Sequence, residues 1–168
     1  MKKVLFCLVP LLFLLSACFS DPVQDDLIDY NNQDLKKAAQ LEKEAIDAYD
    51  SVTGANYTSD AVMYDTMTSE VIPTYRKFVD ELENIDVETD DLRKVHEGYI
   101  KAANTQYNAF IKIVSALEKQ DRNLIAEANA MLDEARKGIR DYNAAIKKLA
   151  KEHDVKIEEP KTQRENSL

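Results

Sequence analysis

The chain has no Trp, only three Gly and four Pro, and two residues each of Cys and His among its 168 residues. This inventory allows one helical domain and leaves almost no catalytic residues. No Gly-rich phosphate loop, serine-nucleophile motif or zinc-binding His pair occurs in the sequence. We therefore do not expect an enzyme, and we expect no cofactor and no metal.

The first seventeen residues differ from the rest of the chain. Lys2 and Lys3 precede an apolar run from Val4 to Leu15, which is the pattern of an export signal. The stretch from Val4 to Ala17 holds fourteen residues, including a proline, whereas a membrane-spanning helix needs about 20 apolar residues. We expect residues 1–17 to be a signal peptide that is removed after export.

A short motif closes this segment. Leu15-Ser16-Ala17-Cys18 is a Leu, two small residues and a Cys, and it resembles the lipobox of bacterial lipoproteins. The resemblance covers residues 1–18 and implies that Cys18 carries a diacylglyceryl group and becomes the mature N-terminus. Two acyl chains supply the double anchor that stable membrane attachment requires. The alternative is an ordinary secretory signal cut near Ala17, which leaves Cys18 free.

Processing at this motif would remove thiol chemistry and sharpen the charge. Cys7 leaves with the signal and Cys18 carries lipid, so the mature domain would have no disulfide and no cysteine nucleophile. Loss of residues 1–17 removes two Lys and no acid, which leaves 20 basic and 31 acidic residues and a net charge of −11. Such a body repels nucleic acids and anionic headgroups, so we expect no nucleic-acid partner and membrane contact through the anchor.

Helical periodicity runs through almost all of the remaining chain. Apolar residues at steps of three, four or seven predict helices over about 24–53, 59–85, 90–119 and 122–153. The apolar stripe of the first helix includes Ile28, Ala38 and Ala45, and the third helix has two neighbouring apolar seams, one of which includes Ala103 and Phe110. The fourth helix repeats apolar residues every seven positions, at Ile125, Leu132, Ile139 and Ile146 and at Ala128, Ala135, Tyr142 and Leu149.

Pro73 lies inside the second helix and predicts a bend there. We expect an all-α, up-and-down four-helix bundle over 24–155. A short linker, 18–23, joins it to the anchor, and a disordered polar tail, 156–168, follows it.

The junction of the last two helices leaves an alternative open. No Gly or Pro separates them, so a fold of three helices with one long helix from about 90 to 153 would also satisfy the pattern. We favour a turn at residues 120–123, because Asp and Asn are poor helix formers and Asp121 can cap the next helix. Thr89 is the expected cap of the third helix.

The ionisable clusters have ordinary interpretations. We interpret His96 as a surface residue beside Glu97 and His153 as a residue of a last helical turn, because neither has a Glu three residues before it as di-iron bundles require. The acidic run 86–91 lacks the Gly and the distant Glu of a calcium loop. It is interpreted as helix capping and solvation.

Tyrosines and glycines supply the remaining candidates. Four tyrosines on the predicted apolar stripes are assigned to packing: Tyr49, Tyr75, Tyr99 and Tyr142. Tyr57, in the predicted loop 54–58, is the best candidate for contact with a partner. Gly98 and Gly138 lie inside helices, where Gly costs about 1 kcal/mol relative to Ala. This cost predicts close approach of neighbouring helices at these positions, with a pocket as the alternative reason for either glycine.

These observations favour a non-enzymatic lipoprotein, anchored on the extracytoplasmic face of the cell membrane, that interacts with an unknown protein or cell-envelope partner. Its export signal, size and composition resemble those of small helical lipoproteins of low-GC Gram-positive bacteria. The alternative is a ligand-binding lipoprotein that holds a small or lipidic molecule between its helices. A filled interior with an exposed patch at one loop end would favour the first function, and a closed apolar cavity the second.

Overall fold

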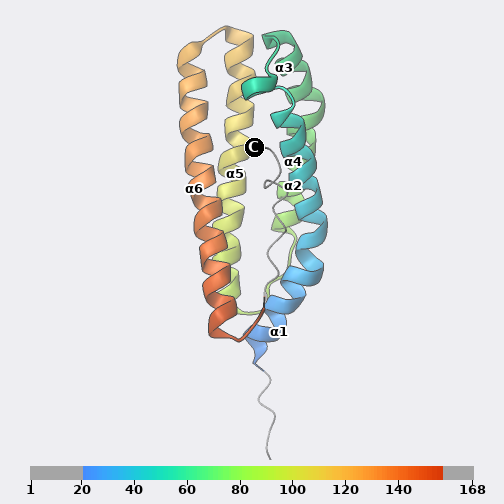
Figure 1. Cartoon of the computed structure of the whole chain (residues 1–168), viewed down its shortest axis with the longest axis vertical. Helices are drawn as coiled ribbons and strands as arrows, with labels where there is room; N and C mark the ends of the chain where they lie inside the picture. The colour runs from blue at the N-terminus through green and yellow to red at the C-terminus, as the bar shows by residue number, and fades with distance from the viewer. Residues whose placement is uncertain (1–20, 157–168) are drawn as a thin grey trace, which may run out of the picture.

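A computed structural model describes residues 21–156, in which helices and turns occur without strands. The elements are α1 (Pro22–Asp29), η1 (Tyr30–Asp34), α2 (Leu35–Asp50), η2 (Gly54–Asn56), α3 (Asp60–Thr66), η3 (Met67–Val71), α4 (Ile72–Glu83), α5 (Asp90–Lys119) and α6 (Arg122–Glu152). The chain runs up through α1–η1–α2, down through α3–η3–α4, up through α5 and down through α6 (Figure 1). The predicted all-α, up-and-down four-helix bundle is confirmed.

Segments α1, η1 and α2 form the first rod of the bundle. In the part of this rod before the π-helical segment η1, the buried residues differ from those that the apolar stripe predicts. Beyond η1 the stripe is confirmed, since Ala38 and Ala45 are fully buried. Before η1 the buried residues are Leu27 and Tyr30, whereas Ile28, predicted on the stripe, is 39% exposed. A π-turn holds more residues than an α-turn. The segment η1 therefore shifts the buried face by one position, which apolar spacing alone does not reveal.

The bend expected at Pro73 takes the form of a second π-helical segment. Segment η3 comes directly before α4, whose second residue is Pro73, and the chain stays helical from 60 to 83. Proline lacks an N–H group and clashes with the preceding turn, and the wider π-turn makes room for its ring. Met67, Val71 and Tyr75, spaced by four, are all fully buried, as a turn wider than 3.6 residues allows.

Helices α5 and α6 are separate, so the single long helix is excluded. Gln120 takes up a left-handed conformation, with φ 55° and ψ 37°, and ends α5. The Asp121 carboxylate then accepts a hydrogen bond of 2.8 Å from the Asn123 N–H at the start of α6. The predicted turn and its cap are confirmed. Thr89 occupies the N-cap position of α5 as predicted, but its side chain makes no capping hydrogen bond, because its hydroxyl donates to Asp26 at 2.5 Å.

Among residues 21–156, helix packing closes three sides of the bundle and leaves the fourth side open. Helix α5 packs along α6 and also on α4, as its two apolar seams predict, and α4 packs on α2. Helices α2 and α6 hardly approach each other, and they flank the open side that faces the viewer in Figure 1. None of the helices among residues 21–156 is long and apolar enough to cross a membrane.

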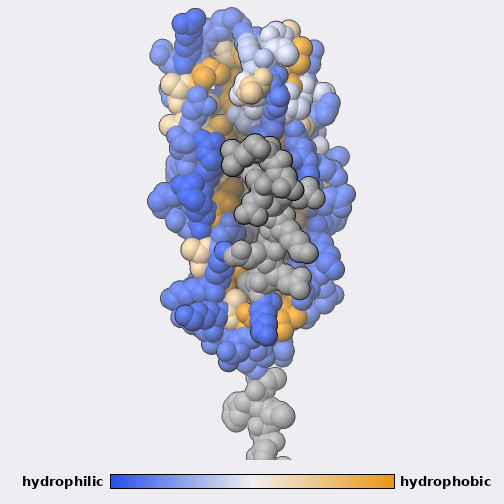
Figure 2. Space-filling view, in the orientation of Figure 1, coloured by the Kyte–Doolittle hydropathy of each residue, from blue (hydrophilic) through white to orange (hydrophobic). Residues whose placement is uncertain are grey.

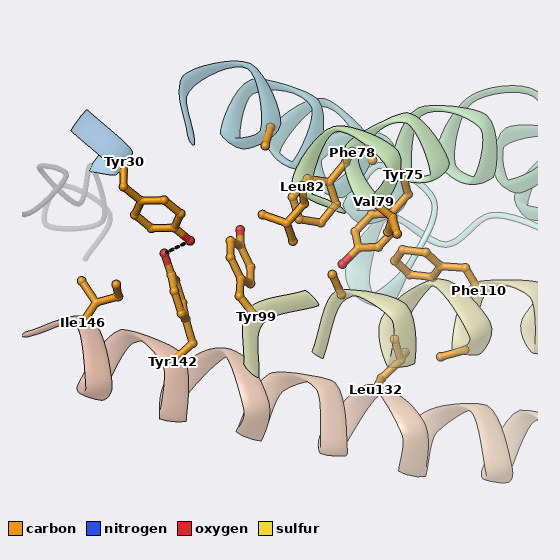
Figure 3. Packing of buried hydrophobic residues seen from close by; sticks show 14 of the residues in the cluster. Tyr30, Tyr75, Phe78, Val79, Leu82, Tyr99, Phe110, Leu132, Tyr142 and Ile146 are labelled. Carbon is orange, nitrogen blue, oxygen red and sulfur yellow. Dashed lines mark hydrogen bonds between the residues drawn. The ribbon is translucent and has the colours of Figure 1, made fainter. Parts of the chain in front are cut away.

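Aromatic side chains fill the middle of the core (Figure 3). Tyr75 meets Phe78 and Phe110 edge-on at ring-centroid distances of 5.0 and 5.1 Å, and Tyr99 stacks on Tyr142 at 4.3 Å. The packing role predicted for Tyr75, Tyr99 and Tyr142 is confirmed by their burial. The fourth tyrosine of that group, Tyr49, is half-buried on the open side.

The two helical glycines differ in their surroundings. A Cβ atom at Gly138 would lie 2.8 Å from the Ala102 Cβ, so Gly138 lets α6 approach α5 closely, as predicted. A Cβ atom at Gly98 would meet nothing within 4 Å. The prediction of close approach is therefore wrong for Gly98, which instead lines an open surface groove between α5 and α6.

Candidate functional site

The predicted lipidation site and most of the predicted tail lie outside the described residues. Cys18 and the signal segment precede residue 21, and the tail continues past residue 156. The described chain nevertheless fixes how close Cys18 is to the bundle. Helix α1 begins at Pro22, capped by the Asp21 carboxylate, so three residues separate Cys18 from the first helix. The first helix thus begins two residues before its predicted start at about residue 24.

Tyr57 lies between η2 and α3, and α3 is at the opposite end of the bundle from α1 (Figure 1). The Tyr57 side chain is 48% exposed, and its hydroxyl donates a 2.8 Å hydrogen bond to Asp60. Tyr57 lines a surface concavity of about 460 Å³ between the segment 57–63 and the α5–α6 turn, here called the distal concavity. Met63, Leu117 and Ile125 supply its apolar wall.

Carboxylates and tyrosine hydroxyls surround this apolar wall. Asp60 and Asp121 line the distal concavity itself. On the neighbouring surface, the Tyr64 hydroxyl donates to Glu118 at 3.0 Å. The carboxylate that accepts each hydrogen bond raises the pKa of the Tyr57 and Tyr64 hydroxyls, so both remain protonated donors at neutral pH. The end of the bundle thus combines apolar surface with negative charge.

His96 is buried, so its interpretation as a surface residue is wrong. Its ring is 3% exposed, with Nε2 3.1 Å from the Leu82 carbonyl oxygen and Nδ1 2.8 Å from the Tyr30 hydroxyl. A carbonyl oxygen only accepts, so Nε2 carries the proton and Nδ1 accepts from Tyr30. Burial lowers the pKa of His96 and favours this neutral form. Both ring nitrogens are therefore engaged inside the protein.

The Tyr30 hydroxyl also lies 3.3 Å from the Tyr142 hydroxyl, the dashed contact in Figure 3. Because Tyr30 donates to His96, Tyr142 donates to Tyr30, and the three side chains form one chain of hydrogen bonds between the first rod, α5 and α6. A sequence signal for His96 existed. It lies seven residues before Ala103 and fourteen before Phe110, on a seam that the apolar pattern had already defined.

A third polar group faces the open side. Glu42 on α2 is half-buried and accepts a 2.6 Å hydrogen bond from the Tyr99 hydroxyl. Beside it, α2, α5 and α6 enclose a cavity of about 270 Å³, here called the flank cavity, which Glu42, Tyr49, Gln106 and Arg136 help to line. No pattern in the sequence singles out Glu42 or Gln106, since each is one polar residue among many on a long helix.

The chain's similarity to other proteins was also tested. Comparison with protein-family models, with curated proteins and with solved structures gave no match. Within residues 21–156 no group of three or more His, Cys, Asp and Glu side chains is arranged to hold a metal ion. The acidic residue Asp26 instead accepts hydrogen bonds from the Thr89 N–H and hydroxyl, which joins the first rod to the start of α5.

Proposed function

We propose that this chain is a lipid-anchored extracytoplasmic protein that binds a protein or another cell-envelope component at the distal concavity, without catalysis. The observation that carries the proposal is the placement of two features at opposite ends of one rigid bundle. The first helix begins three residues after Cys18, and the segment between η2 and α3, which holds Tyr57, lies at the far end (Figure 1). An anchor at Cys18 would therefore turn the distal concavity away from the membrane.

The length of the bundle supports this arrangement. Helix α5 has 30 residues, and at about 1.5 Å per residue it spans about 45 Å. The excess of acidic residues adds to the effect, since anionic headgroups repel a negatively charged body. The distal concavity would then stand about 45 Å from the bilayer, within reach of partners in the envelope.

The composition of the distal end supports a contact role. Tyr57 and Val62 are 48% and 46% exposed, and exposed apolar side chains inside a polar rim are typical of interaction sites. Figure 2 shows apolar surface at this upper end among the hydrophilic helices. Support for a non-catalytic role comes from the absence of nucleophile motifs in the sequence and from His96, whose two nitrogens are both bonded internally.

Replacement of Cys18 by Ser tests the anchor. We expect the Cys18→Ser protein to be released into the extracytoplasmic fluid or to accumulate as uncut precursor, because serine offers no thiol for acylation. Fractionation of cells into membrane and soluble protein, followed by immunoblotting, measures this. A Cys18→Ser protein that is still processed and still sediments with membranes would refute the anchor.

A photo-crosslinking amino acid tests the contact surface in native membranes. Placed at position 57 it should form one discrete adduct, and Val62→Glu should abolish that adduct by adding charge to the apolar surface. The same amino acid at Ile111, which is 43% exposed on the side of α5, is the matched control and should form none. Equal adducts from both positions would contradict the proposal.

A second candidate function is the binding of a small molecule. The flank cavity favours it, because the buried Gln106 amide lines this cavity and has no hydrogen-bond partner among the described residues. The flank cavity is partly polar and opens to the surface. A small polar ligand therefore fits it better than a lipid does.

A further inference from the structure

The flank cavity exists because α2 and α6 stand apart on the open side of the bundle. Three helices line it. Helix α2 supplies Glu42, Ile46 and Tyr49, helix α6 supplies Leu132, Arg136 and Ile139, and helix α5 supplies Gln106. Apolar and polar side chains thus share one recess of about 270 Å³. That volume suits a molecule of a few heavy atoms.

Polar groups at this level of the bundle lack partners. Gln106 is only 7% exposed, and its amide makes no hydrogen bond to the rest of residues 21–156. The Tyr75 hydroxyl is fully buried and also unpaired, and Figure 3 shows it directed into the bundle interior. Native proteins pair nearly all buried polar groups, because an unpaired one destabilises the fold. The Tyr75 hydroxyl does not line the flank cavity, whereas the unbonded Gln106 amide does, and this amide indicates that something else completes the site.

Electrostatics indicate the charge of the missing component. Tyr99 donates to one carboxylate oxygen of Glu42, Oε2, and the other oxygen has no bonded partner among the described residues. Burial raises the pKa of Glu42 and the pKa of the Tyr75 hydroxyl, and the Glu42 carboxylate adds to the rise at Tyr75. Arg136 lines the same cavity but already pairs with Asp133 at 2.5 Å. The lining therefore carries two carboxylates, Glu42 and Asp50, against one guanidinium group that a third carboxylate engages.

We propose that the flank cavity binds a small protonated amine with a short apolar body. An ammonium group has three N–H donors, and the cavity offers acceptors for all of them in the free Glu42 oxygen, the Gln106 carbonyl and the Tyr49 hydroxyl. Ile46, Leu132 and Ile139 cover the apolar body. This site is separate from the distal concavity and does not depend on the proposed envelope contact.

Thermal unfolding of the processed full-length protein in detergent tests the charge of the ligand. The probes are isobutylamine, isobutanol and isobutyrate, which share an apolar body and differ in charge. Isobutylamine at ten times its Kd should raise the Tm by about 3 °C or more, while isobutanol and isobutyrate should leave it unchanged. No shift with isobutylamine up to 50 mM, on the order of the weakest useful affinity, or an equal shift with isobutyrate, would overturn the proposal.

Variants of the lining residues test whether isobutylamine binds in the flank cavity. Glu42→Gln keeps an oxygen for Tyr99 and removes the charge, so it should weaken isobutylamine binding at least tenfold. Glu44→Gln, an exposed change on the same helix, is the matched control and should bind like the wild type. If Glu42→Gln does not fold, Gln106→Leu replaces the unpaired amide and should weaken the amine effect. An isobutylamine shift that persists in the folded variant would overturn the site, whereas the crosslink at position 57 should be unaffected in all of them.

Discussion

Replacement of the two helical glycines by alanine should have opposite effects on stability. Both positions are helix interiors, where Ala is more favourable than Gly by about 1 kcal/mol. At Gly98 the added methyl group meets no atom within 4 Å, so Gly98→Ala should stabilise the bundle by about 1 kcal/mol. At Gly138 the methyl carbon would lie 2.8 Å from the Ala102 Cβ, well inside van der Waals contact.

The clash at Gly138 has no easy relief. The Ala102 methyl group has no rotamer to change, so the backbones of α5 and α6, the most extensively packed pair of helices among residues 21–156, must move apart. Overpacking of this kind costs about 1–3 kcal/mol, which cancels or exceeds the gain in helix propensity. We therefore expect Gly138→Ala to be less stable than Gly98→Ala by about 1–3 kcal/mol.

Urea and thermal unfolding followed by circular dichroism measure both variants. A change of 1 kcal/mol should move the Tm by about 3–4 °C in a domain of this size. The double variant Ala102→Gly with Gly138→Ala removes the clash and should recover stability beyond the sum of its single changes. A Gly138→Ala protein as stable as Gly98→Ala would refute the close approach of α5 and α6.

Three further changes test the turn and the buried hydrogen bonds. Gln120→Gly should raise the free energy of unfolding by about 1 kcal/mol in urea titrations, because Gly tolerates the left-handed backbone better; a loss of stability would contradict this turn. Tyr30→Phe should destabilise by about 1–3 kcal/mol, because it leaves the buried His96 Nδ1 unpaired, and equal stability to wild type would argue against the bond. The His96 pKa is lowered in the fold, so its contribution is complete above the unfolded pKa of about 6.5 and falls as acid is added, by at most about 1.4 kcal/mol per pH unit. His96→Gln should flatten this part of the pH profile between pH 7 and 5, and an unchanged profile would contradict the assignment.

The fold could be predicted from the sequence wherever apolar spacing stays in phase. The seven-residue repeats of α6 predict its buried face, and Ala128, Leu132 and Ala135 are buried as expected. The α5–α6 turn followed from helix propensity at Asp121, and the structure bears this out. In these elements local preference and tertiary packing agree.

The π-helical segments and the buried polar residues could not be predicted in the same way. A π-turn shifts the register by about one residue, so the stripe placed Ile28 where the bundle buries Leu27. His96 was predicted to lie at the surface because its side chain is polar and ionisable, but it shares an apolar seam of α5 and is buried. Its burial depends on Tyr30, a partner 66 residues away in the sequence. Contacts between residues so far apart in the sequence are revealed only by the tertiary packing of the helices.

Mass spectrometry of the native protein tests the central claim most directly. The protein is extracted from membranes with detergent and its N-terminal peptide is fragmented. We expect the mature chain to begin at Cys18, with a diacylglyceryl group on the sulfur atom. An N-terminus elsewhere, or a bare thiol at Cys18, would contradict the anchor and with it the orientation of the distal concavity.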